Sequence, residues 1–301
     1  MIVIVGGRGF LAAHTRIALG NSQRVLVSQA PPLTPPLETC ERWMSRSEFG
    51  GGPGDDVLKR ADAVIYLSSA SVPGDSSVDM SRELTLNVAP VADLLSRLVS
   101  VDSGARFIYV SSGGTVYGSD LREDPVTEDH ALAPISHYGL GKVLIEELIH
   151  FAGRSHNRPY AILRVANPVG CYVHSRQQGL VPAALRAVRS GHSLKIFGDG
   201  EARRDYLSAI DVGIAIAKAA AASKFTRAVW NVGSGRGRSI LEMITLIGNA
   251  IGHDVPFEFA ASRSVDVPKI VLDSTRIATD LDWHAEGDLA SVIKDMWIKD
   301  V

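Results

Sequence analysis

The sequence of 301 residues predicts an α/β protein, a doubly wound parallel sheet followed by a smaller C-terminal lobe. Two observations predict this fold. Short apolar runs alternate with helical patterns through the first half of the chain, as parallel strands covered on both faces require. The first run leads directly into a glycine-rich turn over residues 6–9, typical of the first strand-to-helix connection in such sheets. We expect the sheet domain over residues 1–167 and the lobe over 168–301, with some later segments returning to the sheet domain.

The elements of the first half follow from the spacing of apolar residues. Near-continuous apolar runs predict strands over residues 1–5, 24–28, 63–68, 106–111 and 160–165. Apolar residues repeated every three or four positions predict helices around residues 88–98 and 143–149. Residues 30–54 are rich in proline and glycine, so we expect a loop with little regular structure there.

The pattern changes after Pro168, which is why a separate lobe is expected. The spacing of apolar residues predicts helices over 181–190, 209–222 and 239–251, and strands over 193–197 and 229–232. Ser239 stands three residues before Glu242, which predicts a capping box at the start of the third helix.

The composition disfavours several functional classes. The formal net charge is −2, so the chain lacks the basic bias of nucleic-acid and membrane-surface proteins. Cys40 and Cys171 are the only two cysteines, too few for a disulfide framework and without metal-ligand spacing, so we expect no metal and a reducing, cytoplasmic setting. No apolar run reaches the length of a membrane span, and residues 1–5 read as a buried strand because no basic leader precedes them.

The glycine-rich turn predicts a site for a dinucleotide. Gly6 allows the tight turn, and Gly9 lets the backbone approach a pyrophosphate. Ala12 is the third small residue, which allows the helix and strand to pack closely. The phosphates are then expected at the helix N-terminus, where free N–H groups point toward them.

The end of the second strand bears on the choice between NAD and NADP. A site for NAD usually has an acidic residue there for the ribose 2′-hydroxyl, whereas this chain has Ser28. Arg8 lies within the turn, where its guanidinium could bind a 2′-phosphate. These residues favour NADP slightly. The alternative is that Arg8 is a solvated loop charge and Ser28 is incidental.

A tyrosine–lysine pair predicts proton transfer. Of the seven tyrosines, only Tyr138 has a lysine four residues on, Lys142, so both side chains share one face of a helix. Lys142 and an oxidised nicotinamide are both positive, so we expect them to lower the pKa of Tyr138 from its usual value of about 10. The alternative is an ordinary surface pair, which the glycine turn and the serine-rich segment after the fourth predicted strand disfavour. Together these motifs indicate redox chemistry on an alcohol or ketone.

Further segments match a known family in order along nearly the whole chain. They are residues 64–69, Asn87 at a helix start, residues 110–118, residues 163–168, residues 197–201 and 204–206, and residues 263–268. With these segments the chain resembles the extended short-chain dehydrogenase/reductases, specifically the nucleotide-sugar epimerase/dehydratase family, and most of all UDP-glucose 4-epimerase-like proteins. The resemblance implies a Rossmann-type sheet domain, a nucleotide-sugar substrate that is UDP-linked, and a homodimer.

The resemblance also implies roles for residues at matched positions. Tyr138 is the implied acid/base, Lys142 holds the nicotinamide ribose, and Arg263 binds the substrate diphosphate, although each arginine could also be a surface charge. The implied cofactor-binding set is Gly6, Arg8, Gly9, Phe10, Leu11, Ser28, Leu67, Ser68, Ser69, Asn87, Ser111, Tyr138, Lys142 and Val165. The implied substrate-binding set is Asn167, Gln178, Leu180, Phe197, Arg204, Arg263 and Asp266.

The chain departs from the family where the catalytic hydroxyl is expected, because Gly113 stands there. The developing oxyanion still needs a polar partner in a closed pocket. If the segment is extended, Thr115 points to the same side as Gly113 and is the expected substitute. Ser112 takes the role if the glycines bend the segment. A third possibility is that Thr115 packs in the core and water fills the gap.

The expected activity is epimerisation of a nucleotide sugar through a transient ketone. An NADPH-dependent reductase of a keto-sugar nucleotide uses the same residues, and Arg8 and Ser28 favour it. A dehydratase is disfavoured because the acidic pair needed for elimination is replaced by Gly113-Gly114. A non-catalytic, redox-sensing protein is disfavoured because Tyr138 and Lys142 are both present.

Overall fold

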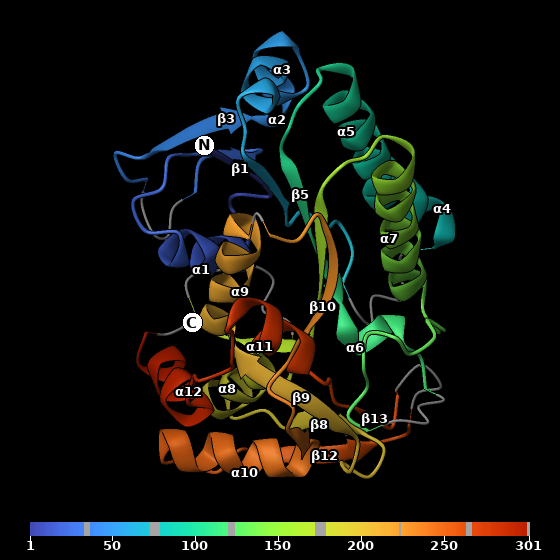
Figure 1. Cartoon of the computed structure of the whole chain (residues 1–301). Helices are drawn as coiled ribbons and strands as arrows, with labels where there is room; N and C mark the ends of the chain where they lie inside the picture. Colours follow the sequence, from blue (N-terminus) through green and yellow to red (C-terminus); the bar gives the residue numbers. More distant parts are fainter. Residues whose placement is uncertain are drawn as a thin grey trace.

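A computed structural model describes residues 1–32, 37–72, 79–119, 124–171, 179–222, 224–262 and 267–299. It has a large sheet domain and a smaller lobe below it in the view of Figure 1. The expected doubly wound parallel fold is confirmed, because the sheet has seven parallel strands in the order β10-β6-β5-β4-β1-β2-β3. Their bounds are β1 (Ile2–Val5), β2 (Arg24–Ser28), β3 (Glu41–Ser45), β4 (Ala63–Tyr66), β5 (Arg106–Ser112), β6 (Tyr160–Val165) and β10 (Arg227–Val232).

The strand order reverses between β1 and β4, the kind of point at which open parallel sheets bind ligands. The chain runs from β1 to β2 and β3 in one direction, then returns to β4 on the other side of β1. At such a reversal the two connecting segments diverge and leave a crevice beyond the carboxyl ends of the strands. Figure 1 shows α6 (Gly113–Val116) and the N-terminal end of α7 (His137–Ser155) at this end of the sheet, facing the lobe.

Alternate residues of each strand enter two separate cores. Ile4 belongs to the core beneath α1 (Phe10–Ala18) and α9 (Ala209–Ala221), whereas Val3 and Val5 belong to the opposite one. That opposite face is covered by α3 (Gly52–Lys59), α5 (Ala89–Ser100) and α7. α4 (Met80–Glu83), a π-helical turn, η1 (Leu84–Val88), and α5 follow one another without a break and form one long helical segment.

The lobe has its own apolar core, which includes Val181, Leu185, Met243 and Ile293. Its strands are β7 (Asn167–Val169), β9 (Arg203–Ser208), β11 (Gly237–Ser239) and β13 (Lys269–Ile270) in one sheet, with β8 (Leu194–Phe197) and β12 (Phe257–Ala260) in another. Its helices are α8 (Leu180–Ser190), α10 (Ile240–Ile251) and α12 (Leu289–Ile298), while α11 (Thr275–Leu281) lies against β10. β10 and α9 come from the second half of the chain but pack with the sheet domain.

Most predicted elements are found, but two predictions are wrong. The capping box of Ser239 and Glu242 is present, and strands 24–28 and 160–165 have the predicted bounds. Asn87 does not start a helix, because it lies in η1, within a helical segment that begins at Met80. Residues 30–54 are not a loop, because they contain β3, α2 (Arg46–Phe49) and the start of α3. β3 is an edge strand with one buried residue, Met44, so it lacks the continuous apolar run that marks the inner strands. No helix in the described ranges is long and apolar enough to cross a membrane.

Candidate active site

The glycine turn closes tightly against the neighbouring strand. Gly6 has φ +89°, and a Cβ there would lie 2.8 Å from the Ser68 backbone nitrogen, so only glycine fits. Gly9 is the N-cap of α1, and no side chain among the described residues caps this end. Phe10 and Leu11 begin the helix, and Ala12 is fully buried. The first turn of α1 therefore presents backbone N–H groups suited to phosphate oxygens.

Asn87 holds the loop that follows β4. Its side-chain oxygen accepts the Ala70 N–H at 2.7 Å, and its amide donates to the Ser71 hydroxyl at 2.8 Å. This loop carries Leu67, Ser68 and Ser69, the residues expected at the cofactor, directly across from Gly6. Asn87 thus fixes the second wall of the crevice.

The end of β2 carries Ser28 in place of an acidic residue, and an arginine follows each of the two neighbouring strands, Arg8 after β1 and Arg46 after β3. The Ser28 hydroxyl donates to the Ala30 carbonyl oxygen at 2.6 Å and accepts from the Trp43 indole at 3.1 Å. Arg8 is exposed, and Arg46 donates to the Ser68 hydroxyl at 2.8 Å. Sequence reasoning missed Arg46 because it lies in the segment expected to be a loop. An arginine directly after a third strand would have been the signal.

Tyr138 and Lys142 share one face of α7, as the spacing predicts. The Lys142 ammonium lies 5.4 Å from the centre of the Tyr138 ring and 5.0 Å from the centre of the Tyr109 ring. It also donates to the Val110 carbonyl oxygen at 3.2 Å. The lysine is therefore buried between two aromatic faces, one from α7 and one from β5.

The electrostatics of this pair differ from the expectation. Burial raises the pKa of Tyr138 rather than lowering it; a hydrogen bond with the Ser112 side chain opposes this shift, and Glu83 adds to it. Burial also lowers the pKa of Lys142 to about 8, opposed by Glu83 and Glu146. In the protein without ligands, desolvation outweighs the favourable charge, so a phenolate needs the second cation that an oxidised nicotinamide would bring.

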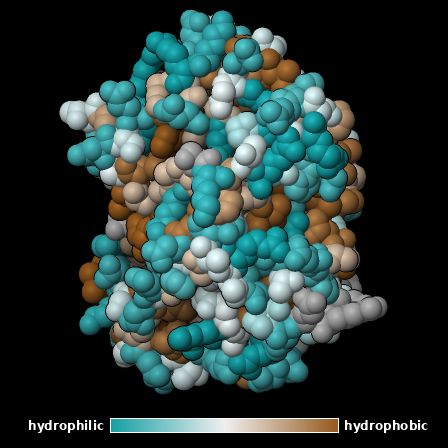
Figure 2. All heavy atoms as spheres, in the orientation of Figure 1, coloured by the Kyte–Doolittle hydropathy of each residue, from teal (hydrophilic) through white to brown (hydrophobic). Residues whose placement is uncertain are grey.

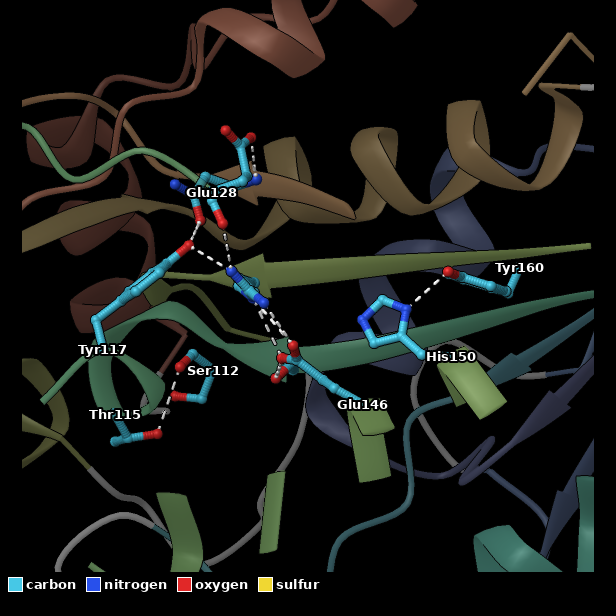
Figure 3. Close-up of polar contacts among 10 residues, drawn as sticks. Ser112, Thr115, Tyr117, Glu128, Glu146, His150 and Tyr160 are labelled. Atoms are coloured by element: carbon cyan, nitrogen blue, oxygen red, sulfur yellow. Dashed lines mark hydrogen bonds and ion pairs between the residues drawn. The ribbon is translucent and has the colours of Figure 1, made fainter. Parts of the chain in front are cut away.

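The position of the missing hydroxyl is filled by Leu272. A Cβ at Gly113 would lie 2.4 Å from the Leu272 Cδ1, so a larger residue at 113 would displace this side chain. The chain turns into α6 at Gly113, so the alternation that favoured Thr115 does not occur. The Thr115 hydroxyl instead lies 3.4 Å from the Ser112 carbonyl oxygen, to which it donates (Figure 3). Ser112 is the residue whose side chain reaches Tyr138.

Replacing Ser112 by alanine is expected to lower turnover by about 10²-fold, the effect of losing one donor to a developing oxyanion. Thr115→Val, which keeps the side-chain shape, is the matched control and is expected to reduce turnover much less. Steady-state rates of both variants decide between the two hydroxyls. A Thr115→Val enzyme more impaired than Ser112→Ala would assign the role to Thr115.

A buried polar network supports the site from behind. The Arg164 guanidinium pairs with the Glu146 carboxylate at 2.7 Å and donates to the Tyr117 hydroxyl and the Glu128 carbonyl oxygen, each at 3.0 Å. The Ser111 hydroxyl donates to Glu146, so this expected cofactor residue faces the protein interior instead. Figure 3 shows how the network joins β5, α7 and the segment that carries Glu128. Val165, at the end of β6, is buried in the core.

The described substrate residues lie on the lobe side of the crevice. The Asn167 amide donates to the Asp205 carbonyl oxygen at 2.9 Å, which joins β7 to β9, the strand that carries Arg204. Leu180 begins α8, and Phe197 is an exposed ring at the end of β8. Gln178, Arg263 and Asp266 lie outside the described residues. In the described ranges, no cluster of three or more His, Cys, Asp or Glu side chains is placed to hold a metal ion.

These features define a Rossmann-type dinucleotide-binding protein. They are a strand that leads through a glycine turn into an uncapped helix, and a Tyr–Lys pair at the same end of the sheet. The family model described as "NAD dependent epimerase/dehydratase family" matches residues 2–233. The chain belongs to this family.

Curated relatives and solved structures match along the whole chain. The UDP-glucose 4-epimerase of Bacillus subtilis is 26% identical over 332 residues, covering 98% of this chain and 95% of the relative. The dTDP-4-dehydro-6-deoxyglucose reductase of Escherichia coli is 26% identical over 294 residues, covering 94% and 92%. A UDP-glucose-4-epimerase from Stenotrophomonas maltophila, solved with bound NAD and formylated UDP-arabinopyranose, has the same fold, with a TM-score of 0.87, 22% identity and coverage of 99% and 96%.

Proposed function

We propose that this protein is an NAD(P)-dependent nucleotide-sugar epimerase that inverts C4 of a UDP-hexose through a transient 4-keto sugar. The observation that carries the proposal is the placement of Tyr138 and Lys142 on one face of α7, with the Ser112 side chain on the phenol. The curated relative named UDP-glucose 4-epimerase supports the choice of a UDP-hexose.

The residues around the glycine turn fit NAD or NADP. The turn packs closely against the Ser68 backbone, so that only glycine fits at Gly6, and the first N–H groups of α1 lack a side-chain cap in the described residues. When bound, the dinucleotide supplies a hydride acceptor and donor. The solved neighbour with NAD supports this cofactor class.

The chain's own residues then move the proton and hold the substrate. Tyr138 takes the proton of the C4 hydroxyl and returns it, while Ser112 hydrogen-bonds the reacting oxygen. Lys142 holds the nicotinamide ribose and stabilises the phenolate. Asn167 and Arg204 hold the nucleotide end with Gln178, Leu180, Phe197, Arg263 and Asp266. A firmly held diphosphate leaves the sugar ring free to present either face.

A reductase of a 4-keto-sugar nucleotide is the second candidate. Arg8 and Arg46, which follow the strands on either side of β2, favour NADP together with the neutral Ser28 at the end of β2. NADP is the cofactor of reductive metabolism, and one curated relative is named a reductase. Incubation with UDP-glucose and UDP-galactose, with and without NADPH, separates the two activities. Interconversion without net cofactor consumption supports the epimerase, whereas loss of NADPH absorbance in proportion to a keto-sugar supports the reductase.

Removing either arginine is expected to weaken NADP(H) selectively. Arg8→Ala and Arg46→Ala should each raise the dissociation constant of NADP(H) about tenfold, the size of one charged hydrogen bond, and change that of NAD(H) much less. Fluorescence titration measures both constants. Arg60→Ala, which removes an exposed arginine that donates to the Asp56 carbonyl oxygen, is the control. Equal losses for both cofactors would refute a 2′-phosphate role.

We also propose a homodimer through η1 and α7. The sheet-facing stripe of α5, from Val91 to Leu98, is buried within the chain, yet large apolar residues stay exposed on this side of the molecule. They are Leu84 (41%), Leu86 (43%), Leu140 (38%) and Phe151 (56%). Figure 2 shows apolar atoms along the edge where Figure 1 places α4 and α7. Exposed apolar side chains gathered on one face indicate a protein interface.

Light scattering is expected to report a dimer at micromolar concentration. Phe151→Glu should shift the protein toward the monomer, because a carboxylate would be buried in the interface. Phe259→Glu, at an exposed ring of the lobe, is the control and should leave the dimer intact. A monomeric parent protein would reject this interface.

We place the protein in the cytoplasm. Both cysteines, Cys40 and Cys171, are free thiols, which supports a reducing compartment.

A further inference from the structure

A buried carboxylate that no family motif accounts for lies beside the Tyr–Lys pair. Glu83 is the last residue of α4, only 1% exposed, at the point where the helix becomes π-helical. π-Helical turns are often found at functional sites. Its carboxylate accepts a hydrogen bond from the Ser71 hydroxyl at 2.6 Å, and the same hydroxyl accepts from Asn87. Glu83 is thereby fixed to the loop that forms the second wall of the cofactor crevice.

Gly141 provides the space that Glu83 occupies. A Cβ at this position would lie 2.3 Å from one carboxylate oxygen of Glu83 and 2.5 Å from its Cγ. Gly141 stands between Tyr138 and Lys142 on α7, so the carboxylate lies against the turn of helix that joins them. Only a residue without a side chain permits this contact, which makes Glu83 and Gly141 a matched pair.

Two carboxylates act on Lys142, those of Glu83 and Glu146. In the described residues, only Glu146 is already paired with an arginine. Glu146, four residues after Lys142, is already paired with Arg164 and accepts from Ser111. Within the described ranges, Glu83 forms no ion pair with arginine, and Ser71 is its hydrogen-bonding partner. A buried ammonium needs a counter-charge.

We propose that Glu83 is a positioning residue for the Tyr138–Lys142 pair: its carboxylate fills the space left by Gly141 and serves as the counter-ion of Lys142. The proposal rests on the function proposed above. It adds to that function a residue that sets the pH range in which the pair works.

The direction of the effect follows from the charges that face the pair. On α7 these are Tyr138, Lys142 and Glu146; β5 contributes Tyr109, β4 contributes Tyr66, and α4 contributes Glu83. The negative charge of Glu83 raises the pKa of Lys142 and also raises that of Tyr138. Removing this charge must therefore lower both pKa values, so that both groups titrate at lower pH.

Glu83→Gln tests this directly, because it keeps the shape of the side chain and removes its charge. With oxidised NAD(P) bound, whose positive charge favours the phenolate, tyrosinate absorbance gives the midpoint of Tyr138 when a Tyr138→Phe protein in the same background is subtracted. We expect this midpoint to fall by about one pH unit, the lower end of the effect of a nearby charge. Both limbs of the pH–rate profile should move to lower pH by a similar amount. An unchanged midpoint with unchanged limbs would overturn the proposal, whatever the change in maximal rate.

Three further variants separate charge from packing. Gly141→Ala should displace the carboxylate and move the midpoint in the same direction, without changing any titrating side chain. Glu83→Asp keeps the charge and should restore the parent midpoint. Glu147→Gln removes an exposed carboxylate of α7 and should change nothing. A midpoint that moves equally in Glu147→Gln, or stays fixed in Gly141→Ala, contradicts the proposal.

The titration needs no substrate. It therefore decides the role of Glu83 even if no UDP-sugar is converted, a result that would count against the proposed function alone.

Discussion

Tyr138→Phe is expected to lower turnover of the nucleotide sugar by at least about 10²-fold, the lower end for loss of a general acid or base. The phenylalanine ring keeps the contact between the Tyr138 ring and the Lys142 ammonium, which lie 5.4 Å apart. The change removes only the hydroxyl that exchanges a proton with the sugar. Fold and cofactor affinity should therefore be retained, as circular dichroism and a fluorescence titration with NAD(H) and NADP(H) would show.

Tyr160→Phe is the matched control for this variant. The Tyr160 hydroxyl is bonded to His150 at 2.7 Å, so the control also removes a hydrogen-bonded phenol next to α7 (Figure 3). No hydrogen bond among the described residues joins this phenol to a proposed site residue, so turnover should remain at the parent level. Near-normal activity of Tyr138→Phe would contradict the assignment of the acid/base.

Arg164→Met is expected to reduce the free energy of unfolding by about 3–5 kcal/mol, the effect of leaving a buried charge without its partner. The Glu146 side chain is fully buried, and Arg164 supplies its ion pair as well as the hydrogen bond to Tyr117. Chemical unfolding measures the loss. The double variant Glu146→Gln with Arg164→Met should recover much of it, because no buried charge then remains.

Arg203→Met is the control for a solvated ion pair. The charged groups of Arg203 and Glu242 lie 3.0 Å apart, and both side chains are well exposed. Loss of this ion pair should therefore change the free energy of unfolding little. An Arg164→Met protein as stable as the Arg203→Met protein would show that the network does not stabilise the site.

The inner strands and the glycine turn were predictable because their signals are local. A strand buried on both faces must be apolar throughout, and Gly6 must be glycine because of its own backbone angle. The edge strand β3 has no continuous apolar run, because its sequence includes the charged residues Glu41 and Arg42. The Glu41 side chain is buried through ion pairs with Arg16 and Arg24, partners that are distant in sequence. The neighbouring Arg46 was missed for the same reason.

The polar partners of the site were less predictable because they depend on contacts between distant segments. Glu83 reaches the pair only because α4 packs against α7 at a glycine, and nothing near Glu83 in sequence records that contact. Gly113 is matched to Leu272, more than half the chain away, which is why the expected hydroxyl position is closed. The helical turn at α6 removes the alternation that favoured Thr115, and we therefore propose Ser112 for this role.

The direct test of the proposed mechanism uses UDP-glucose carrying deuterium at C4, incubated with the protein in ordinary water. A hydrogen that leaves C4 as hydride and returns to the other face never exchanges with solvent. Hydride transfer and return predict UDP-galactose that keeps its deuterium at C4, with no net change in the cofactor. UDP-galactose with protium at C4 would contradict it, because inversion would then proceed by proton loss to water.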